Sequence, residues 1–229
     1  MPTEPMPPGE PAGVRGSRIA LAGLLFAGLF LVAWLLLRSS PDFDATDQEL
    51  RAYYGDPDQR QASILAALYV VPLAAIAFIW FMAALRDRYV RSSSREHTIL
   101  STAHVVAGTL VVVSLFLMAT VELSVGRLAG TSDALDVGGA RALLALGQAA
   151  SDIMALRAAA VFVAISTSRG VRSGLFPRAF GVLSVLVALA LLFVYASAQW
   201  VGLLFPAWVA ASSIMILIRR RGVGLAEDA

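Results

Sequence analysis

The chain has 229 residues, of which 58% are hydrophobic and only 15% are charged, and its formal net charge is +2. A soluble globular domain usually carries about 25% charged residues, so this composition excludes an ordinary soluble domain. Cysteine is absent. Disulfide bonds, thiolate chemistry and cysteine-ligated metals are therefore excluded as well.

Polar residues are confined to short segments between apolar blocks of roughly 20 positions, the length that crosses the hydrocarbon core of a bilayer. This pattern predicts an all-α protein, a polytopic transmembrane helical bundle. Residues 1–14 hold five of the ten prolines, which indicates a disordered tail. The first span follows at 19–37, and its apolar run is longer than a typical signal core, which favours an uncleaved span over a secretory signal.

The segment 38–61 is the largest polar loop, with six acidic residues and three arginines. Thr46 and Glu49 have the spacing of a capping box, which predicts a short helix over 47–54. Gly55 ends this helix, and Pro57 is expected to keep it from resuming. The acidic residues lack the glycine and glutamate positions of an EF-hand, so the loop is interpreted as solvated rather than as a calcium site.

Five further apolar blocks predict spans over 63–85, 97–123, 141–165, 179–198 and 202–218. Pro72 lies inside the second span and predicts a kink there. The six spans form one transmembrane domain over 15–221, with 38–61 as an extracytoplasmic loop. Residues 222–229 are predicted to be a second disordered cytoplasmic tail.

Arginine is divided unevenly between the two sides of the predicted bundle, with twelve on one side and five on the other. The positive-inside rule places the richer side, and with it both termini, in the cytoplasm. An even number of spans agrees with this orientation. The sequence therefore predicts a multi-pass protein of the cell membrane, with the loop 38–61 outside. The richer set is Arg15, Arg18, Arg86, Arg88, Arg91, Arg95, Arg169, Arg172, Arg178, Arg219, Arg220 and Arg221.

The fourth span places ionisable side chains deep within an apolar helix. Gln148 and Asp152 are four residues apart, with Ser151 close by, so they form a polar stripe that should face the bundle. Arg157 points elsewhere and lies about 12 Å from the cytoplasmic end of the predicted span. His104 on the third span falls at a comparable depth, so a contact between these two helices is expected, although like charges disfavour a protonated histidine beside Arg157. These five residues are the candidate polar cluster.

Three interpretations of this cluster stay open. The side chains hold helices together by hydrogen bonds, each worth about 0.6 kcal/mol. Alternatively they line a cavity that binds a small ligand or relays a proton through Asp152, because intramembrane ionisable residues are candidate functional sites. In the third interpretation the span is misplaced and Asp152 lies nearer the surface.

Enzyme chemistry is not indicated. The sequence contains no HExxH, no GxSxG and no phosphate-binding glycine loop. Its two histidines, His97 and His104, are about 10 Å apart along a helix and cannot chelate one ion alone. We therefore expect no catalytic residues, no metal, no cofactor and no nucleic-acid partner.

Four segments carry a resemblance to a family: YYGDPDQR, LAAIAFIWFMAALRDR, LRAAAVFVAISTSRGVRSGLFPR and LLFPAWVAASSIMILIRR. They resemble a group of uncharacterised six-span integral membrane proteins common in actinobacteria. The resemblance covers most of the chain after the first span and implies the same topology. It also implies that Arg157 occupies a family position, whereas His104 matches none. No catalytic residue follows from it.

Two functions remain as expectations. The first is a noncatalytic membrane component or accessory subunit that contacts the lipid bilayer and a membrane protein partner or further copies of itself. The second is a small carrier or sensor with a polar intramembrane cavity around Asp152. The substrate, the partner and the oligomeric state do not follow from the sequence.

Overall fold

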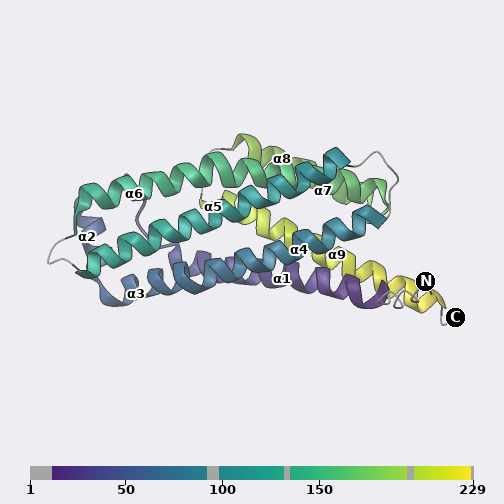
Figure 1. Ribbon diagram of the computed structural model, residues 1–229, viewed down its shortest axis with the longest axis horizontal. Coiled ribbons are helices and arrows are strands. Elements are labelled where there is room, and N and C mark those ends of the chain that lie inside the picture. Colours follow the sequence, from purple (N-terminus) through teal and green to yellow (C-terminus); the bar gives the residue numbers. More distant parts are fainter. Residues whose placement is uncertain (1–11, 92–97, 132–134, 195–198, 228–229) are drawn as a thin grey trace, which may run out of the picture.

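Long helices make up the molecule (Figure 1), because in lipid a helix satisfies its backbone groups within its own segment. The computed structural model describes residues 12–91, 98–131, 135–194 and 199–227, and no strand occurs in these ranges. Five segments in them are long and apolar enough to cross a membrane: Ile19–Leu37, Pro57–Tyr89, Ile99–Thr131, Val137–Arg172 and Trp200–Ile218. The all-helical class is thus confirmed for the described residues, and five of their segments have the length and composition of membrane spans.

Several helices follow one another with little or no interruption, so the twelve named elements form fewer long rods. Pro57 to Arg91 is one rod, and Val137 to Arg172 is another. The elements are α1 (Ala12–Leu37), α2 (Asp47–Gly55), α3 (Pro57–Leu65), η1 (Ala66–Val70), α4 (Val71–Arg91), α5 (Thr98–Thr131), α6 (Val137–Ala149), η3 (Ala150–Ala155), α7 (Leu156–Arg172), α8 (Arg178–Phe193), η4 (Gln199–Leu203) and α9 (Leu204–Glu227).

The predicted capping box is confirmed at the start of α2. Thr46 Oγ1 accepts from the Glu49 amide, and the Glu49 carboxylate accepts from the Thr46 amide at 2.8 Å. The expectation for Pro57 is wrong, because a helix resumes there at once. Asp56 caps α3 by accepting from the amides of Asp58 and Gln59, and Pro57 takes the first helical position, where its missing amide hydrogen costs nothing.

Two π-helical segments interrupt the long rods. η1 lies directly before Pro72, whose missing amide hydrogen and ring disturb the α-helical pattern one turn earlier. A π segment keeps the carbonyls bonded by pairing with the fifth residue instead of the fourth. The predicted irregularity at Pro72 therefore takes the form of this π turn. η3 contains Asp152 and has no proline near it.

Aromatic rings from α1, α4, α7 and α9 meet at the centre of the bundle. Phe78 lies between Phe26, Phe162 and Phe205, with ring centroids 5.1 to 5.3 Å from it. Trp208 extends the cluster towards α8, where its indole nitrogen donates to Ser184 Oγ at 2.8 Å. This cluster is the central contact between the rods.

A second, separate core lies at one end of the molecule. It joins α2 to the last turns of α5 and to α6, through Leu50, Tyr53, Tyr54, Val121, Val125, Val137, Ala140 and Leu144. Arg141 ties the same elements together by donating to Asp47 Oδ1 at 2.8 Å and to the Ala45 carbonyl at 3.0 Å. We call α2, α3, α6 and the part of α5 from Val121 onward the lobe.

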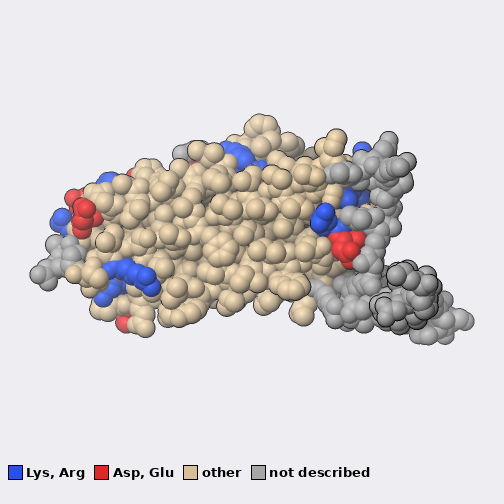
Figure 2. All heavy atoms as spheres, in the orientation of Figure 1, with Lys and Arg blue, Asp and Glu red and all other residues tan. Residues whose placement is uncertain are grey.

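The lobe follows from helix length. α5 has 34 residues, about 51 Å at about 1.5 Å per residue, whereas a hydrocarbon core is about 30 Å thick. Figure 2 shows charged atoms gathered mainly at the two ends of the molecule, with a broad and almost uncharged band between them. We call the end opposite the lobe the basic end; there α1 begins, α4 and α7 finish, and α9 finishes (Figure 1).

Both predicted tails are shorter than expected where the structure describes them. α1 begins at Ala12, within the stretch 1–14, and the rest of that stretch lies outside the described residues. α9 continues to Glu227, so the prediction of a disordered tail is wrong for 222–227. No proline follows Pro206, and the hydrogen-bonded ladder therefore propagates beyond the apolar residues.

Close packing of α1 on α4 and α9 generates a first prediction. A Cβ atom at Gly23 would collide with Ser213 Oγ and lie 2.8 Å from the Phe81 ring. Gly23→Val should therefore lower the free energy of unfolding by about 1 to 3 kcal/mol, measured by denaturant titration in detergent. Gly28→Val is the matched control, because no described atom lies within 4 Å of its Cβ position. Equal effects at both glycines would contradict the packing.

Candidate functional site

The predicted stripe on the fourth span is present. Gln148 donates through its side-chain nitrogen to both carboxylate oxygens of Asp152, at 3.2 and 3.3 Å. Asp152 is buried, with 8% of its surface exposed. Ser151 is half-buried on the same turn and makes no hydrogen bond to the pair among the described residues.

Asp152 lies near the segment that follows α1, because its charge acts on Asp42, five residues beyond the end of that helix. The rod that carries Asp152 continues to Arg172, seven residues past the predicted end at 165, so twenty residues separate Asp152 from that end. Twenty residues cover about 30 Å, the whole hydrocarbon core. The interpretation that places Asp152 nearer the surface therefore fits the geometry.

Glu122 belongs to the same neighbourhood and was not among the predicted site residues. It accepts from Ser40 Oγ and from the Tyr54 hydroxyl, each at 3.2 Å. Burial and the negative charge of Glu122 raise the pKa of Tyr54, so the phenol keeps its proton and remains a donor. The only sequence signal was the position of Glu122 at the end of an apolar run.

Arg157 reaches across to the end of α8. Its Nη1 donates to the carbonyl of Leu191 at 2.9 Å. The last four carbonyls of a helix have no partner within the helix. α8 has 16 residues and is therefore about 24 Å long, which is too short to cross about 30 Å of hydrocarbon. Arg157 therefore supplies a donor, and a positive charge at the negative end of the helix dipole, where water is scarce.

The expected contact between the third and fourth predicted spans is present, but His104 meets Ser166, which lies nine residues after Arg157 on α7. His104 is fully buried, its Nδ1 lies 3.2 Å from Ser166 Oγ, and its ring stacks on Phe162 at 4.4 Å between centroids. The depth of Arg157 was counted from residue 165, but the helix runs to Arg172. Measured from Arg172, Arg157 lies about 10 Å farther from the helix end than predicted. His104 therefore meets the turns of α7 that follow Arg157.

Around His104 a second polar cluster joins α4, α5 and α7 near the basic end. The Tyr89 hydroxyl donates to the Ser166 carbonyl at 2.8 Å, and the guanidinium of Arg169 lies over the Tyr89 ring, 4.7 Å from its centroid. Arg86 Nε donates to Ser101 Oγ at 3.2 Å. The sequence analysis assigned Arg169 to a surface segment, and nothing in its spacing indicated burial.

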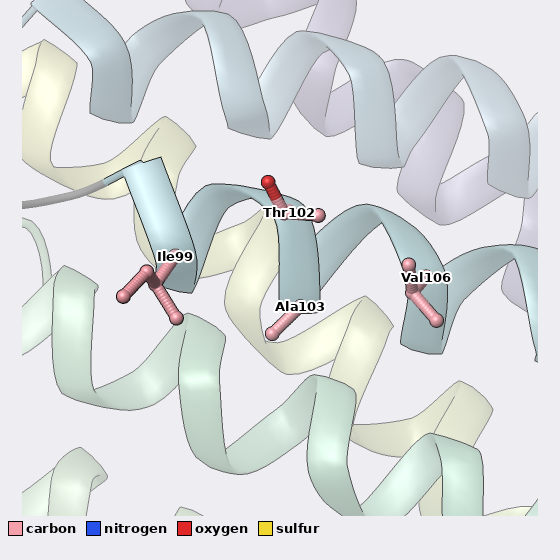
Figure 3. Close-up of a pocket in the computed structure, with 4 residues that line it drawn as sticks. All are labelled: Ile99, Thr102, Ala103 and Val106. Carbon is pink, nitrogen blue, oxygen red and sulfur yellow. The ribbon is translucent and has the colours of Figure 1, made fainter.

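An apolar hollow lies beside the first turns of α5 (Figure 3). It has a volume of about 380 Å³ and is lined by Ile99, Thr102, Ala103 and Val106. Ile99 and Val106 are exposed, whereas Ser101 and His104 on the same turns are buried. The hollow is thus on the outward face of α5, at the other end of the helix from Glu122, and its lining suits an acyl chain better than a polar solute.

Metal chemistry finds no support in these clusters. Across the residues that the structure describes, no three histidine, cysteine, aspartate or glutamate side chains are grouped so that they could hold a metal ion.

The chain matches no protein-family model, and neither the curated proteins nor the solved structures contain a match to it. The resemblance to actinobacterial six-span proteins stays a prediction.

The Arg157 contact generates a second prediction. Arg157→Met keeps a long apolar side chain but removes the charged donor to the Leu191 carbonyl. The free energy of unfolding should fall by about 1.5 to 3 kcal/mol, the usual value of a hydrogen bond to a charged group. Arg127→Met, at an exposed position of the lobe, is the control and should change it little. The same loss in both variants would contradict a capping role.

The acidic neighbourhood generates a third prediction, on pH. Partial burial and the charges of Asp44 and Asp152 raise the pKa of Asp42, so the folded protein holds this proton more tightly than the unfolded chain does. The stability that Asp42 contributes is complete below its ordinary pKa of 3.8 and is lost as the pH rises through the raised pKa.

Asp42→Asn imitates the neutral form at every pH. Its free energy of unfolding should exceed that of the wild type at neutral pH, and the two should converge at acidic pH, as measured by denaturant titration across a pH series. Asp58→Asn, which replaces an exposed carboxylate of α3, should show no such gain. A difference between Asp42→Asn and wild type that stays constant with pH would contradict the raised pKa.

Proposed function

We propose that the protein is a noncatalytic component of the cell membrane, a scaffold or accessory subunit that works through helix contacts. The observation that carries this proposal is that the predicted polar residues are used within the bundle. Asp152 is bound by Gln148 on its own rod, whereas Arg157 binds the end of α8 and His104 of α5 lies against Ser166 of α7. The last two contacts join neighbouring helices, which is the role expected of polar residues in membrane bundles.

The proposal includes six crossings, with both termini in the cytoplasm. α8 is the sixth apolar helix, and with 16 residues it is shorter than the other five segments. The arginine excess supports a cytoplasmic basic end, by the positive-inside rule. The lobe then stands outside the membrane, where it is accessible to a protein partner or to a second copy of the chain.

A sensor with a polar cluster around Asp152 is the second candidate. The charges of Asp42 and Asp152 act on each other, and Gln148 covers one side of Asp152. Partial burial and the negative charges of Asp44 and Asp152 raise the pKa of Asp42. In this proposal the cluster lies at the membrane surface and responds to the pH outside. It is not part of a proton pathway across the membrane.

Purification from the native membrane tests the first proposal and is the fourth prediction. A tagged full-length chain, extracted in mild detergent, should carry a membrane protein or a second copy in fixed ratio. Asp152→Asn should leave the catalytic activities of the membrane unchanged and alter only the folded yield or the recovery of the partner. A chain recovered alone and monomeric, at the same yield, would contradict the accessory role.

The same preparations separate the two candidates. Tryptophan fluorescence is recorded in lipid nanodiscs from about pH 4 to pH 8, the range in which perturbed carboxylates titrate. A transition that Asp152→Asn abolishes, with folding intact, favours the sensor. Asp58→Asn is the control for the general effect of removing a carboxylate. Identical profiles for wild type and Asp152→Asn remove the sensor.

A further inference from the structure

Arg169 is a buried cation whose hydrogen-bonding capacity is unused. Only 5% of its surface is exposed, yet Nη1 and Nη2 have no hydrogen-bond partner in the described part of the chain. A guanidinium presents five N–H donors and cannot be deprotonated, so burial cannot be relieved by loss of the charge. Burying such a group without an acceptor is costly.

The contacts of Arg169 among the described residues are with an aromatic ring and a second cation. The Tyr89 ring stacks under the guanidinium, and its hydroxyl is directed to the Ser166 carbonyl. Arg86 lies close enough for its charge to act on Arg169. The ring offers a cation–π contact, which does not use the N–H groups at the edge of the guanidinium plane. Two positive charges held together in this way attract an anion.

The start of α5 is level with Arg169. His104 of α5 meets Ser166 of α7, and the two helices run in opposite directions. Ser101 lies one turn before His104, and Arg169 lies one turn after Ser166, so both are one turn closer to the basic end than the His104–Ser166 contact. Arg86 donates to Ser101. The amides of the first helical turn have no partner within the helix, and the dipole of a 34-residue helix is positive there.

We propose that Arg169, Arg86 and the first turn of α5 bind a phosphate-type oxyanion at the basic end of the bundle. The planar fork of Arg169 pairs with two oxygens, Arg86 balances the second charge, and helix amides accommodate a further oxygen. This chemistry is that of an anionic lipid headgroup or of free phosphate. It is independent of the proposed function, because it involves neither Asp152 nor the lobe.

Thermal unfolding of the full-length protein in detergent tests the site. Phosphatidylglycerol should raise the unfolding temperature of the wild type, and phosphatidylcholine should not, because its headgroup carries no net negative charge. Arg169→Gln should weaken the binding of phosphatidylglycerol at least about tenfold, the effect of losing a charge-assisted bidentate contact. Arg172→Gln, one turn later on the exposed surface of α7, should bind like the wild type.

Inorganic phosphate is the arm that separates the two sources. If phosphate alone produces an Arg169-dependent shift, the ligand is a free oxyanion; if only phosphatidylglycerol does, the ligand is a lipid headgroup. Both results support the site. A shift that is equal in wild type and Arg169→Gln, or no shift with either probe, overturns it.

Native mass spectrometry keeps the proposal testable if Arg169→Gln does not fold. From an equimolar mixture, the wild type should retain one phosphatidylglycerol in preference to phosphatidylcholine, or should retain phosphate when phosphate is the only probe. Arg86→Gln should reduce this retention, whereas Arg172→Gln should not. Equal retention of both lipids together with no retained phosphate overturns the proposal.

Discussion

The need to pair every backbone group in lipid governs this structure more than any single contact. A helix that ends in hydrocarbon leaves carbonyls without partners, and each one costs free energy that water would otherwise recover. α8 ends after 16 residues, and Arg157 on the neighbouring helix donates to Leu191 near its end. The same requirement explains why the rod through Pro72 turns into a π segment instead of breaking.

Helix length then decides where the polar residues lie. α5 and the rod from Val137 to Arg172 are longer than a bilayer is thick, and their excess builds the lobe with its own small core. Glu122 thereby lies in the lobe and Asp152 directly follows its helix α6, whereas His104 and Arg169 lie near the basic end. The apolar centre between them is left to aromatic rings such as Phe78 and Phe162.

The sequence predicted features that depend on local chemistry. The all-helical class follows from the apolar runs, and the capping box from the spacing of Thr46 and Glu49. Helix ends were less predictable. The third span is predicted to end at 123, next to Glu122, but a carboxylate ends the apolar run without ending the helix, because the backbone ladder continues to Thr131. The predicted depths of Asp152 and Arg157 were wrong for the same reason, because their helix continues to Arg172 and not to 165.

Arg157 and Arg169 show why polar sites in such a chain cannot be assigned from spacing alone. Both arginines lie on α7 among small and apolar residues, and both reach a neighbouring helix. One donates to the Leu191 carbonyl near the end of α8 and so joins two helices. The other finds the face of a tyrosine and leaves Nη1 and Nη2 unpaired among the described residues. An arginine is structural where a neighbouring helix offers a hydrogen-bond acceptor, and it can bind a ligand where none is offered. Because that helix is distant in the sequence, the difference is visible only in the packed structure.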